Sequence, residues 1–286
     1  MSGLGVVIIG LPASGKTTFL AALWHLVTAR EIEPALRLAD LCAGDATHLH
    51  AIARRWREAR VQDRTTVDQH RMVAMNLLDR SGAKVHVTFP DVAGEAYRRM
   101  WEDRECDPEI RDVLSVSGVL LFVHSDTIEA PRWIEDEIAV AQAIGVGLPE
   151  GTPLEWQPGH APTQVQLVDL LQMLRQDPLN VGPRKLAIML SAWDKGQGEG
   201  LAPEPFLVAK LPLLAQYLQS AADGWSFRVY GLSAQGGDYD QVDLGGAEVP
   251  DAERLRQLDA ASQRIRLVRG TEASHDLTEP IEWLMS

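Results

Sequence analysis

Short apolar runs alternate along the chain with longer segments in which apolar residues recur every three or four positions. Runs of the first kind are typical of strands buried on both faces of a sheet, and segments of the second kind are typical of amphipathic helices. The predicted strands are Leu4–Ile9, Met72–Leu78, Lys84–Phe89, Val119–His124, Lys185–Leu190 and Phe227–Leu232. The predicted helices are Lys16–Arg30, Ala46–Arg60, Ala96–Leu114, Ile134–Ile144, Gln164–Arg175, Glu204–Ala222, Asp251–Val268 and Thr278–Met285. The alternation predicts an α/β fold with a mostly parallel, six-stranded sheet and helices on both of its faces.

Two segments interrupt this alternation. Residues 145–163 contain four glycines and four prolines, and residues 235–250 are rich in glycine and acidic residues. Both compositions are typical of loops. No internal repeat occurs, so we predict a single domain over residues 1–286 with insertions around residues 145–180 and 235–268.

Composition narrows the class of protein. The net charge of −13 disfavours nucleic acid as a partner, because phosphate backbones repel an acidic surface. Cys42 and Cys106 are the only cysteines and lack metal-ligand spacing, so we expect reduced thiols. No apolar stretch approaches the roughly 18 residues of a membrane span, and the first strand begins too early to leave room for a signal peptide. We expect a cytoplasmic protein that does not insert into a membrane.

The stretch GLPASGKT, residues 10–17, follows the first predicted strand and opens the first predicted helix. Strand, glycine-rich loop and helix N-terminus together cradle phosphates with backbone N–H groups. In this pattern Lys16 reaches the outer phosphates, and the hydroxyl of Thr17 is a ligand of Mg²⁺. The stretch therefore predicts a nucleoside triphosphate site.

A second stretch, DVAGE, follows the strand Lys84–Phe89. Asp91 can hold Mg²⁺ through water, and Gly94 can offer its N–H to a γ-phosphate because no side chain blocks close approach. The same letters also describe a common turn. Their place after a strand and downstream of the phosphate loop favours the functional interpretation.

Two further strand ends carry polar groups suited to a purine. Asp194 lies in SAWDK after one strand, and Ser233-Ala234 follows the next. Ligands of open α/β sheets bind at this edge. A carboxylate can accept from N1–H and the 2-amino group of guanine, a donor pair that adenine lacks, and the Ser-Ala turn can give a backbone N–H to guanine O6. The alternative is that Asp194 is only a helix cap or a turn residue.

The order of GLPASGKT, DVAGE, SAWDK and LSAQ resembles that of the small Ras-like P-loop GTPases. More narrowly, PDVAGE, SAWDK and the closing EPIEWLM resemble predicted bacterial double-GTPases, or conflict-system GTPases. The resemblance implies a three-layer P-loop NTPase fold. It also implies that Asp91 and Gly94 sense the γ-phosphate. We expect the nucleotide-binding residues to be Gly10, Ser14, Gly15, Lys16, Thr17, Thr18, Gly94, Asp194, Lys195, Ser233 and Ala234.

The chain departs from the family pattern at the base motif and at the catalytic position. Ser191 and Ala192 stand where the family has asparagine and lysine. Trp193 can compensate by stacking on the base or can pack in the core. Glu95 stands where many members have a glutamine that orients water, and its negative charge beside the γ-phosphate predicts slow hydrolysis.

The segment before the strand Met72–Leu78 holds the remaining GTPase element. Either Thr65 or Thr66 can close over Mg²⁺, and we assign Thr66, with Thr17 and Asp91, as the metal ligands. Arg64 is a candidate arginine finger that neutralises charge on the transferring phosphate. The alternative is that Arg64 continues the solvated, arginine-rich face of the preceding helix.

These observations predict a switch protein that binds GTP or GDP with Mg²⁺ and hydrolyses GTP slowly. Lys16, Glu95 and Arg64 are the predicted catalytic residues, and the output is contact with an effector or activating protein. An ATP-using ATPase or kinase is one alternative. A module that binds GTP or GDP without turnover is another.

Overall fold

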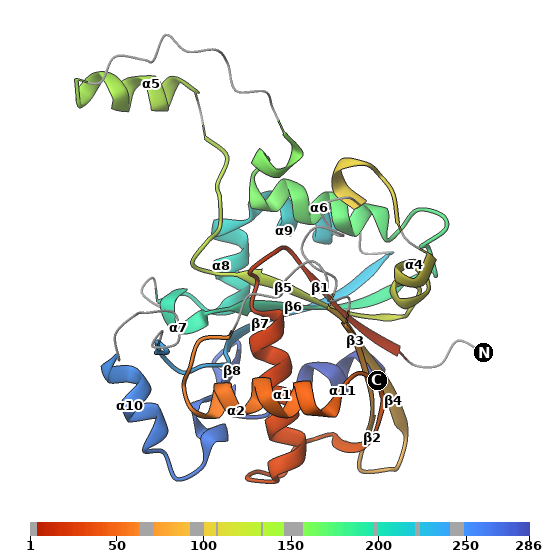
Figure 1. The fold of residues 1–286 in the computed structure, drawn as a ribbon. Coiled ribbons are helices and arrows are strands. Elements are labelled where there is room, and N and C mark those ends of the chain that lie inside the picture. The colour runs from red at the N-terminus through yellow and green to blue at the C-terminus, as the bar shows by residue number, and fades with distance from the viewer. Residues whose placement is uncertain are drawn as a thin grey trace.

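Among the described residues, a nine-stranded sheet in the order β2-β3-β4-β1-β5-β6-β7-β8-β9 runs through the molecule (Figure 1). The computed structural model describes residues 5–62, 71–91, 100–106, 108–132, 134–145, 157–196, 200–220, 224–240 and 249–286. The strands are β1 (Gly5–Gly10), β2 (Arg37–Ala43), β3 (Arg71–Leu78), β4 (Lys84–Asp91), β5 (Gly118–His124), β6 (Arg184–Ser191), β7 (Trp225–Ser233), β8 (Arg266–Arg269) and β9 (Glu272–Ser274).

The centre of this sheet is parallel and its edges are antiparallel. Strands β4, β1, β5, β6 and β7 pair in parallel. At one edge β3 and β2 continue in antiparallel pairs, and at the other edge β8 and β9 do the same. The α/β fold class is therefore confirmed, but the predicted strand number is wrong, because the described residues alone form a sheet of nine strands and not six.

Helices cover both faces of the sheet. The helices of the described residues are α1 (Lys16–Ala29), α2 (Ala46–Arg57), α4 (Pro108–Leu114), α5 (Ile134–Ala143), η1 (Pro158–His160), α6 (Thr163–Met173), α7 (Trp193–Gly196), α8 (Pro203–Lys210), α9 (Pro212–Ser220), α10 (Pro250–Arg256), η4 (Ala261–Arg264) and α11 (Glu279–Met285). Val6 and Ile8 of β1 pack in one core with α1, α2, α10 and α11, whereas Val7 and Ile9 pack in the other with α4, α6, α8 and α9. Successive residues of a strand point to opposite faces, so one strand serves both cores and makes three layers. Helix α5 projects away from these layers (Figure 1).

Three predicted helices differ from the structure. The helix predicted over Glu204–Ala222 is divided at Leu211, because Pro212 disfavours helical backbone in the residue before it. The helix predicted over Ala96–Leu114 is interrupted at residues 103–106, ahead of α4. The helix predicted over Asp251–Val268 ends at Arg256 and is followed by η4 and β8. Within the described residues, no helix combines the length and apolar character that crossing a membrane requires.

Near the C-terminal end of α1, the buried side chain of His25 pairs with Glu31. Nε2 of His25 is 3.1 Å from Oε1 of Glu31, and the His25 ring lies 5.1 Å from the ring of Trp56. Burial lowers the pKa of His25 below its ordinary value, although Glu31 opposes the shift. Burial acts to raise the pKa of Glu31, but hydrogen bonds from Ser262 outweigh it and the pKa is lowered. The folded chain therefore favours neutral His25 beside ionised Glu31.

Acidification is expected to destabilise the protein partly through His25. Since the folded state lowers the pKa of His25, its stabilising contribution is complete above the unfolded pKa of about 6.5. The contribution declines below that value and is lost as the pH falls through the lower folded pKa. Urea unfolding at pH 7.5 and pH 5.5 should show a lower free energy of unfolding at pH 5.5. His25→Gln should reduce this difference, whereas the control His48→Gln should preserve it. An unchanged pH dependence in His25→Gln would contradict the assignment.

Candidate nucleotide-binding site

The carboxyl ends of the five parallel strands meet at one edge of the sheet. The pairing aligns Gly10 of β1 with Phe122 of β5, and Ser191 of β6 with Leu232 of β7. Val7 of β1 pairs with Thr88 of β4. Gly10 comes three residues after Val7, and Asp91 comes three residues after Thr88, so the two strands end at corresponding positions. The backbone of Asp91 thus ends β4 beside the loop that follows β1, as a strand-end position requires for a phosphate site.

The loop of residues 10–15 connects β1 directly to α1. A Cβ on Gly10 would lie 2.6 Å from the carbonyl oxygen of Phe122 and 2.7 Å from Ser14 Oγ, which leaves space only for glycine. Gly15 precedes α1 with a φ of 88°, in the left-handed region that glycine adopts without strain. Glycine at both positions lets the loop turn tightly and brings the N-terminus of α1, with its partial positive charge, to this edge.

Lys16 lies against the backbone of this loop. Its Nζ donates to the carbonyl oxygens of Gly10 and Leu11 at 2.8 Å each, and it is 3.3 Å from Ser14 Oγ. Thr17 and Thr18 follow in the first turn of α1 and are half-buried. The ammonium and the helix N-terminus therefore concentrate positive potential at one place, which suits a phosphate.

Ser191 connects the base-side strands to the phosphate loop. Its Oγ donates to the carbonyl oxygen of Ser14 at 2.8 Å, and it is 3.2 Å from the position of a Cβ on Gly15. Ser125 of the loop after β5 then donates to the carbonyl oxygens of Ser191 (2.7 Å) and Ala192 (2.9 Å). The sequence marks Ser191 only as a departure from asparagine, but its hydroxyl ties two parts of the site together.

A cavity of about 340 Å³ lies on the base side of the edge. It is lined by Asp194 and Ser233 together with residues of α10, β8 and β9. Asp194 is exposed on α7, and Ser233 is buried at the end of β7. The structure thus places the two predicted guanine-reading positions beside the same space.

Two neighbours of Asp194 have structural contacts of their own. Trp193 is 1% exposed, and its ring packs edge-on against Phe206 with centroids 5.1 Å apart, so it packs in the core, although it also lines the base-side cavity. The ammonium of Lys195 is 3.1 Å from Asp238 Oδ1, and this hydrogen bond raises the pKa of Lys195.

A second cavity, of about 450 Å³, lies on the other side of the phosphate loop. Leu11, Pro12 and Ser14 form one wall, and β5, α6, the loops around residues 127–129 and 157–160, and residues 101–102 contribute the others. His124 at the end of β5 also lines it, and burial lowers the pKa of His124. This cavity adjoins the phosphate loop, and neither Asp194 nor Ser233 lines it.

Several predicted site residues lie outside the described part of the chain. They are Arg64, Thr65, Thr66, Gly94 and Glu95. Within the described residues, no group of three or more His, Cys, Asp or Glu is arranged to hold a metal ion. Magnesium keeps several waters and takes few protein oxygens beside nucleotide phosphates. Thr17 lies in the first turn of α1, whereas only the backbone of Asp91 at the end of β4 belongs to the described part of the chain.

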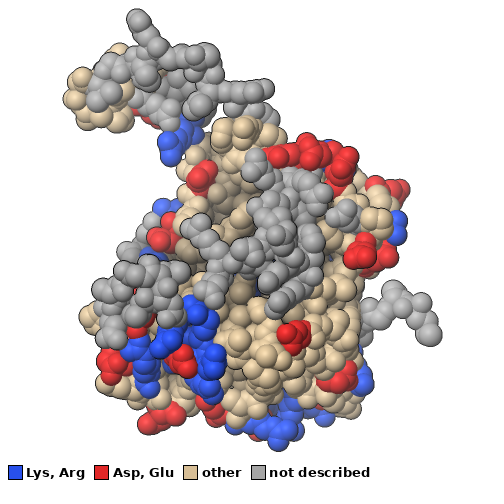
Figure 2. Space-filling view, in the orientation of Figure 1, with Lys and Arg blue, Asp and Glu red and all other residues tan. Residues whose placement is uncertain are grey.

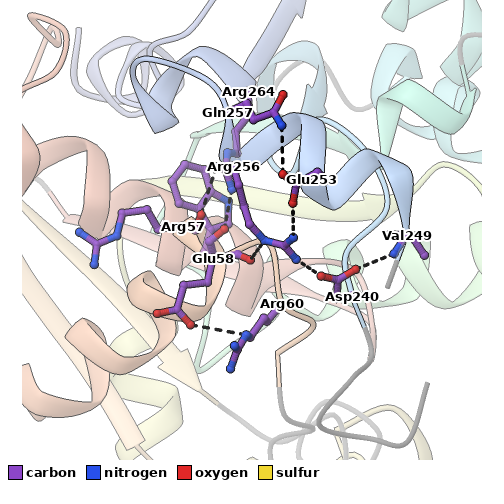
Figure 3. Close-up of polar contacts among 10 residues, drawn as sticks. Arg57, Glu58, Arg60, Asp240, Val249, Glu253, Arg256, Gln257 and Arg264 are labelled. Atoms are coloured by element: carbon purple, nitrogen blue, oxygen red, sulfur yellow. Dashed lines mark hydrogen bonds and ion pairs between the residues drawn. The ribbon is translucent and has the colours of Figure 1, made fainter. Parts of the chain in front are cut away.

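A polar cluster holds the loop after β7 against the end of α2 (Figure 3). Asp240 is buried, pairs with Arg256, and accepts from the N–H of Val249 at 2.7 Å. Its backbone N–H donates to Ala59 at 2.9 Å, and its carbonyl oxygen accepts from Val61 at 3.0 Å. These hydrogen bonds therefore attach Asp240, in the loop after β7, to residues 59–61, which follow α2.

Arginines gather on the same face of this otherwise acidic protein, over the ends of α2 and α10 (Figure 2). Arg54 and Arg57 are exposed on α2, as the solvated-face alternative requires. Arg55 instead turns back to donate to the carbonyl oxygen of Val61 at 3.1 and 2.7 Å. In the described part of the arginine-rich segment, two arginines thus face solvent, and a third bonds the helix to the residues that follow it.

Trp56 is the site residue that sequence reasoning missed. It is fully buried, and its Nε1–H donates to the carbonyl oxygen of Ala234 at 2.9 Å. In the sequence Trp56 continues the apolar face of α2 with Leu49, Ile52 and Ala53, so the pattern predicts only core packing. Its hydrogen bond joins residues 178 positions apart, and a contact at this separation cannot be predicted from a local sequence pattern.

The fold and the phosphate loop define this chain as a P-loop nucleotide-binding protein. The model of the Double-GTPase 1 family matches residues 7–284, so the chain belongs to that family. The resemblance predicted from the motifs is confirmed, and the match supports GTP as the nucleotide. No curated protein matches the sequence.

Solved structures of GTP-binding proteins show a weak similarity to this chain. Nucleolar GTP-binding protein 1 from Plasmodium falciparum is 12% identical, with 88% of this chain and 83% of that chain covered and a TM-score of 0.38. The signal recognition particle receptor SRb-GTP/SRX complex from Chaetomium thermophilum is 12% identical over 90% and 97% of the two chains, with a TM-score of 0.39. A GDP-bound GTP-binding protein from Sulfolobus solfataricus is 12% identical over 91% and 52%, with a TM-score of 0.35. At these TM-scores the similarity adds nothing to the family match.

Proposed function

We propose that this protein is a guanine-nucleotide switch that slowly hydrolyses GTP to GDP and inorganic phosphate. The observation that carries the proposal is the position of Asp194 and Ser233 beside one cavity, at the sheet edge that also holds Lys16. An exposed carboxylate there can accept from N1–H and the 2-amino group of guanine. Adenine has no such donor pair, so the arrangement favours a guanine nucleotide.

The reaction is the attack of water on the γ-phosphate, with GDP as the leaving group. Lys16 and the N-terminal amides of α1 stabilise the negative charge that spreads over the phosphate oxygens. Thr17, Thr66 and Asp91 would hold Mg²⁺, which would supply further positive charge to the phosphate oxygens. Glu95 orients the attacking water, Gly94 contacts the γ-phosphate, and Arg64 supports the transition state. Because Glu95 adds a negative charge beside the phosphate, hydrolysis is slow.

The output of the switch is contact with an effector or activating protein. The segments around Thr66 and Gly94 change conformation when the γ-phosphate leaves, and a partner reads that change. We place the protein in the cytoplasm as a single GTPase-like domain, with insertions around residues 145–180 and 235–268. Its net charge of −13 argues against nucleic acid as the partner.

Guanine selectivity is the first property to measure. Competition between GDP and ADP for the purified protein with Mg²⁺ should favour GDP by at least about 100-fold, because hydrogen bonds to a charged acceptor are each worth about 1.5–3 kcal/mol. Asp194→Ala should remove most of this preference. The control Asp40→Ala, on β2 far along the sheet, should leave it intact. Equal binding of GDP and ADP by the wild type would overturn the switch proposal and favour an ATPase or a kinase.

Turnover separates a slow GTPase from a module that only binds. Wild-type protein with GTP and Mg²⁺ should release phosphate. Tight GTP binding without phosphate release would instead assign a non-hydrolysing regulatory module.

A further inference from the structure

We infer that Trp56 is a specificity-determining positioning residue, which holds the loop after β7 so that a backbone N–H faces guanine O6. The inference rests on the proposed function. Trp56 lies on α2 and never reaches the base itself. Its Nε1–H donates at 2.9 Å to the carbonyl oxygen of Ala234, in the loop that the sequence assigns to base recognition.

This hydrogen bond fixes the orientation of a peptide plane. A trans peptide is planar, and its C=O and N–H point in opposite directions. With the carbonyl of Ala234 directed at Trp56, the N–H of the same peptide unit, on Gln235, is directed away from α2. Ser233 Oγ accepts from the N–H of Gly236 at 3.1 Å, so the loop is held on both sides of Ala234. The loop's remaining N–H donors thus have fixed directions before a ligand binds.

Trp56 is held by polar contacts with Arg264 as well as by apolar packing. The guanidinium of Arg264 lies 4.7 Å from the centre of its ring, and Nη1 of Arg264 donates to the Trp56 carbonyl oxygen at 2.6 Å. Nη2 of Arg264 donates to the carbonyl oxygens of Arg57 (3.2 Å) and Leu255 (3.0 Å). A cation at the C-terminus of α2 is favourable for the helix dipole. Arg264 of η4 therefore links Trp56 of α2 to α10, and the Nε1–H of Trp56 points toward the loop after β7.

The simpler explanation is that any buried indole N–H needs a partner, and Ala234 happens to supply it. Trp24 tests this alternative within the same protein. It is 4% exposed on α1, and its Nε1–H donates to His50 Nδ1 at 3.3 Å, with no hydrogen bond to the loop after β7. Loss of either donor removes the hydrogen bond of a buried indole, although the bond of Trp24 is only partly buried. Only the loss at Trp56 should alter how the base is read.

The experiment compares Trp56→Phe with Trp24→Phe by calorimetric titration of three diphosphates with Mg²⁺. The 6-thio analogue of GDP keeps N1–H and the 2-amino group but replaces O6 by sulfur, a weak acceptor. Inosine diphosphate keeps O6 but lacks the 2-amino group. We expect Trp56→Phe to reduce the preference for GDP over 6-thio-GDP about three- to tenfold, the size of one net hydrogen bond, without changing the preference for GDP over inosine diphosphate. Trp24→Phe should leave both preferences at the wild-type values.

Unchanged O6 discrimination in Trp56→Phe, or equal changes in both variants, would overturn the inference while leaving the proposed function intact. A wild-type protein without guanine preference would overturn both. If Trp56→Phe does not fold, the benzothiophene isostere of the Trp56 side chain removes only the N–H donor and gives the same comparison.

Discussion

Replacing Lys16 by alanine is expected to lower the rate of GTP hydrolysis by at least about 100- to 1,000-fold, the usual cost of removing one transition-state donor. The ammonium of Lys16 is held at 2.8 Å from the carbonyl oxygens of Gly10 and Leu11, within the loop that opens α1. No other described lysine shares this loop. Single-turnover phosphate release measures the chemical step, and titration with GDP measures binding separately.

Lys84→Ala is the matched control for this variant. Lys84 is, like Lys16, the first residue of an element, but it is exposed at the start of β4, and its Nζ lies 3.6 Å from Asp40 Oδ2. It should change neither hydrolysis nor GDP binding. Hydrolysis at the wild-type rate in Lys16→Ala would mean that the loop does not hold the γ-phosphate, and the proposed mechanism would be wrong.

The parts of the fold that the sequence predicts are those with strong apolar patterning. The strand Gly118–His124 is buried along nearly its whole length, and a continuous apolar run marks it clearly. The phosphate loop is predicted equally well, because its glycines, lysine and helix are all local in sequence. Local signals of this kind need no knowledge of distant partners.

The elements that sequence reasoning missed have weak local signals. Strand Arg37–Ala43 is half-exposed and carries an arginine and an aspartate, so its sequence contains no apolar run that would predict a strand. Strands Arg266–Arg269 and Glu272–Ser274 have four and three residues, too few for a periodic pattern. Each of these strands forms by pairing with a neighbour that is already in the sheet, which is a tertiary effect.

The candidate site shows the same division between local and distant contacts. Lys16 and Asp194 are predicted because each belongs to a short motif with a known geometry. The roles of Ser191 and Trp56 depend on hydrogen bonds to Ser14 and Ala234, at separations of 177 and 178 residues. Such contacts appear only when the sheet brings its strand ends together.

Asp194→Asn is expected to exchange guanine for xanthine. The carboxylate of Asp194 accepts from N1–H and the 2-amino group of guanine in the proposed complex. An asparagine keeps one acceptor for N1–H but turns an amide N–H₂ toward the second position, where guanine also presents a donor. Xanthine has a carbonyl oxygen at that position and accepts from the amide. GDP affinity should fall at least about 100-fold, and xanthosine diphosphate should become the tighter ligand.

This reversal is more informative than a simple loss of binding, because a destabilised loop weakens every nucleotide alike. Asp194 is exposed on the short helix α7, so replacing its carboxylate by an amide of the same shape leaves the core beneath it unchanged. Competition among GDP, xanthosine diphosphate and ADP, with Asp40→Asn as the control, measures the exchange. A uniform loss across all three nucleotides would place Asp194 in loop structure rather than in base recognition. A gain for xanthosine diphosphate alone would mean that the carboxylate of Asp194 reads the 2-position of the purine, which is the contact that makes this site specific for guanine.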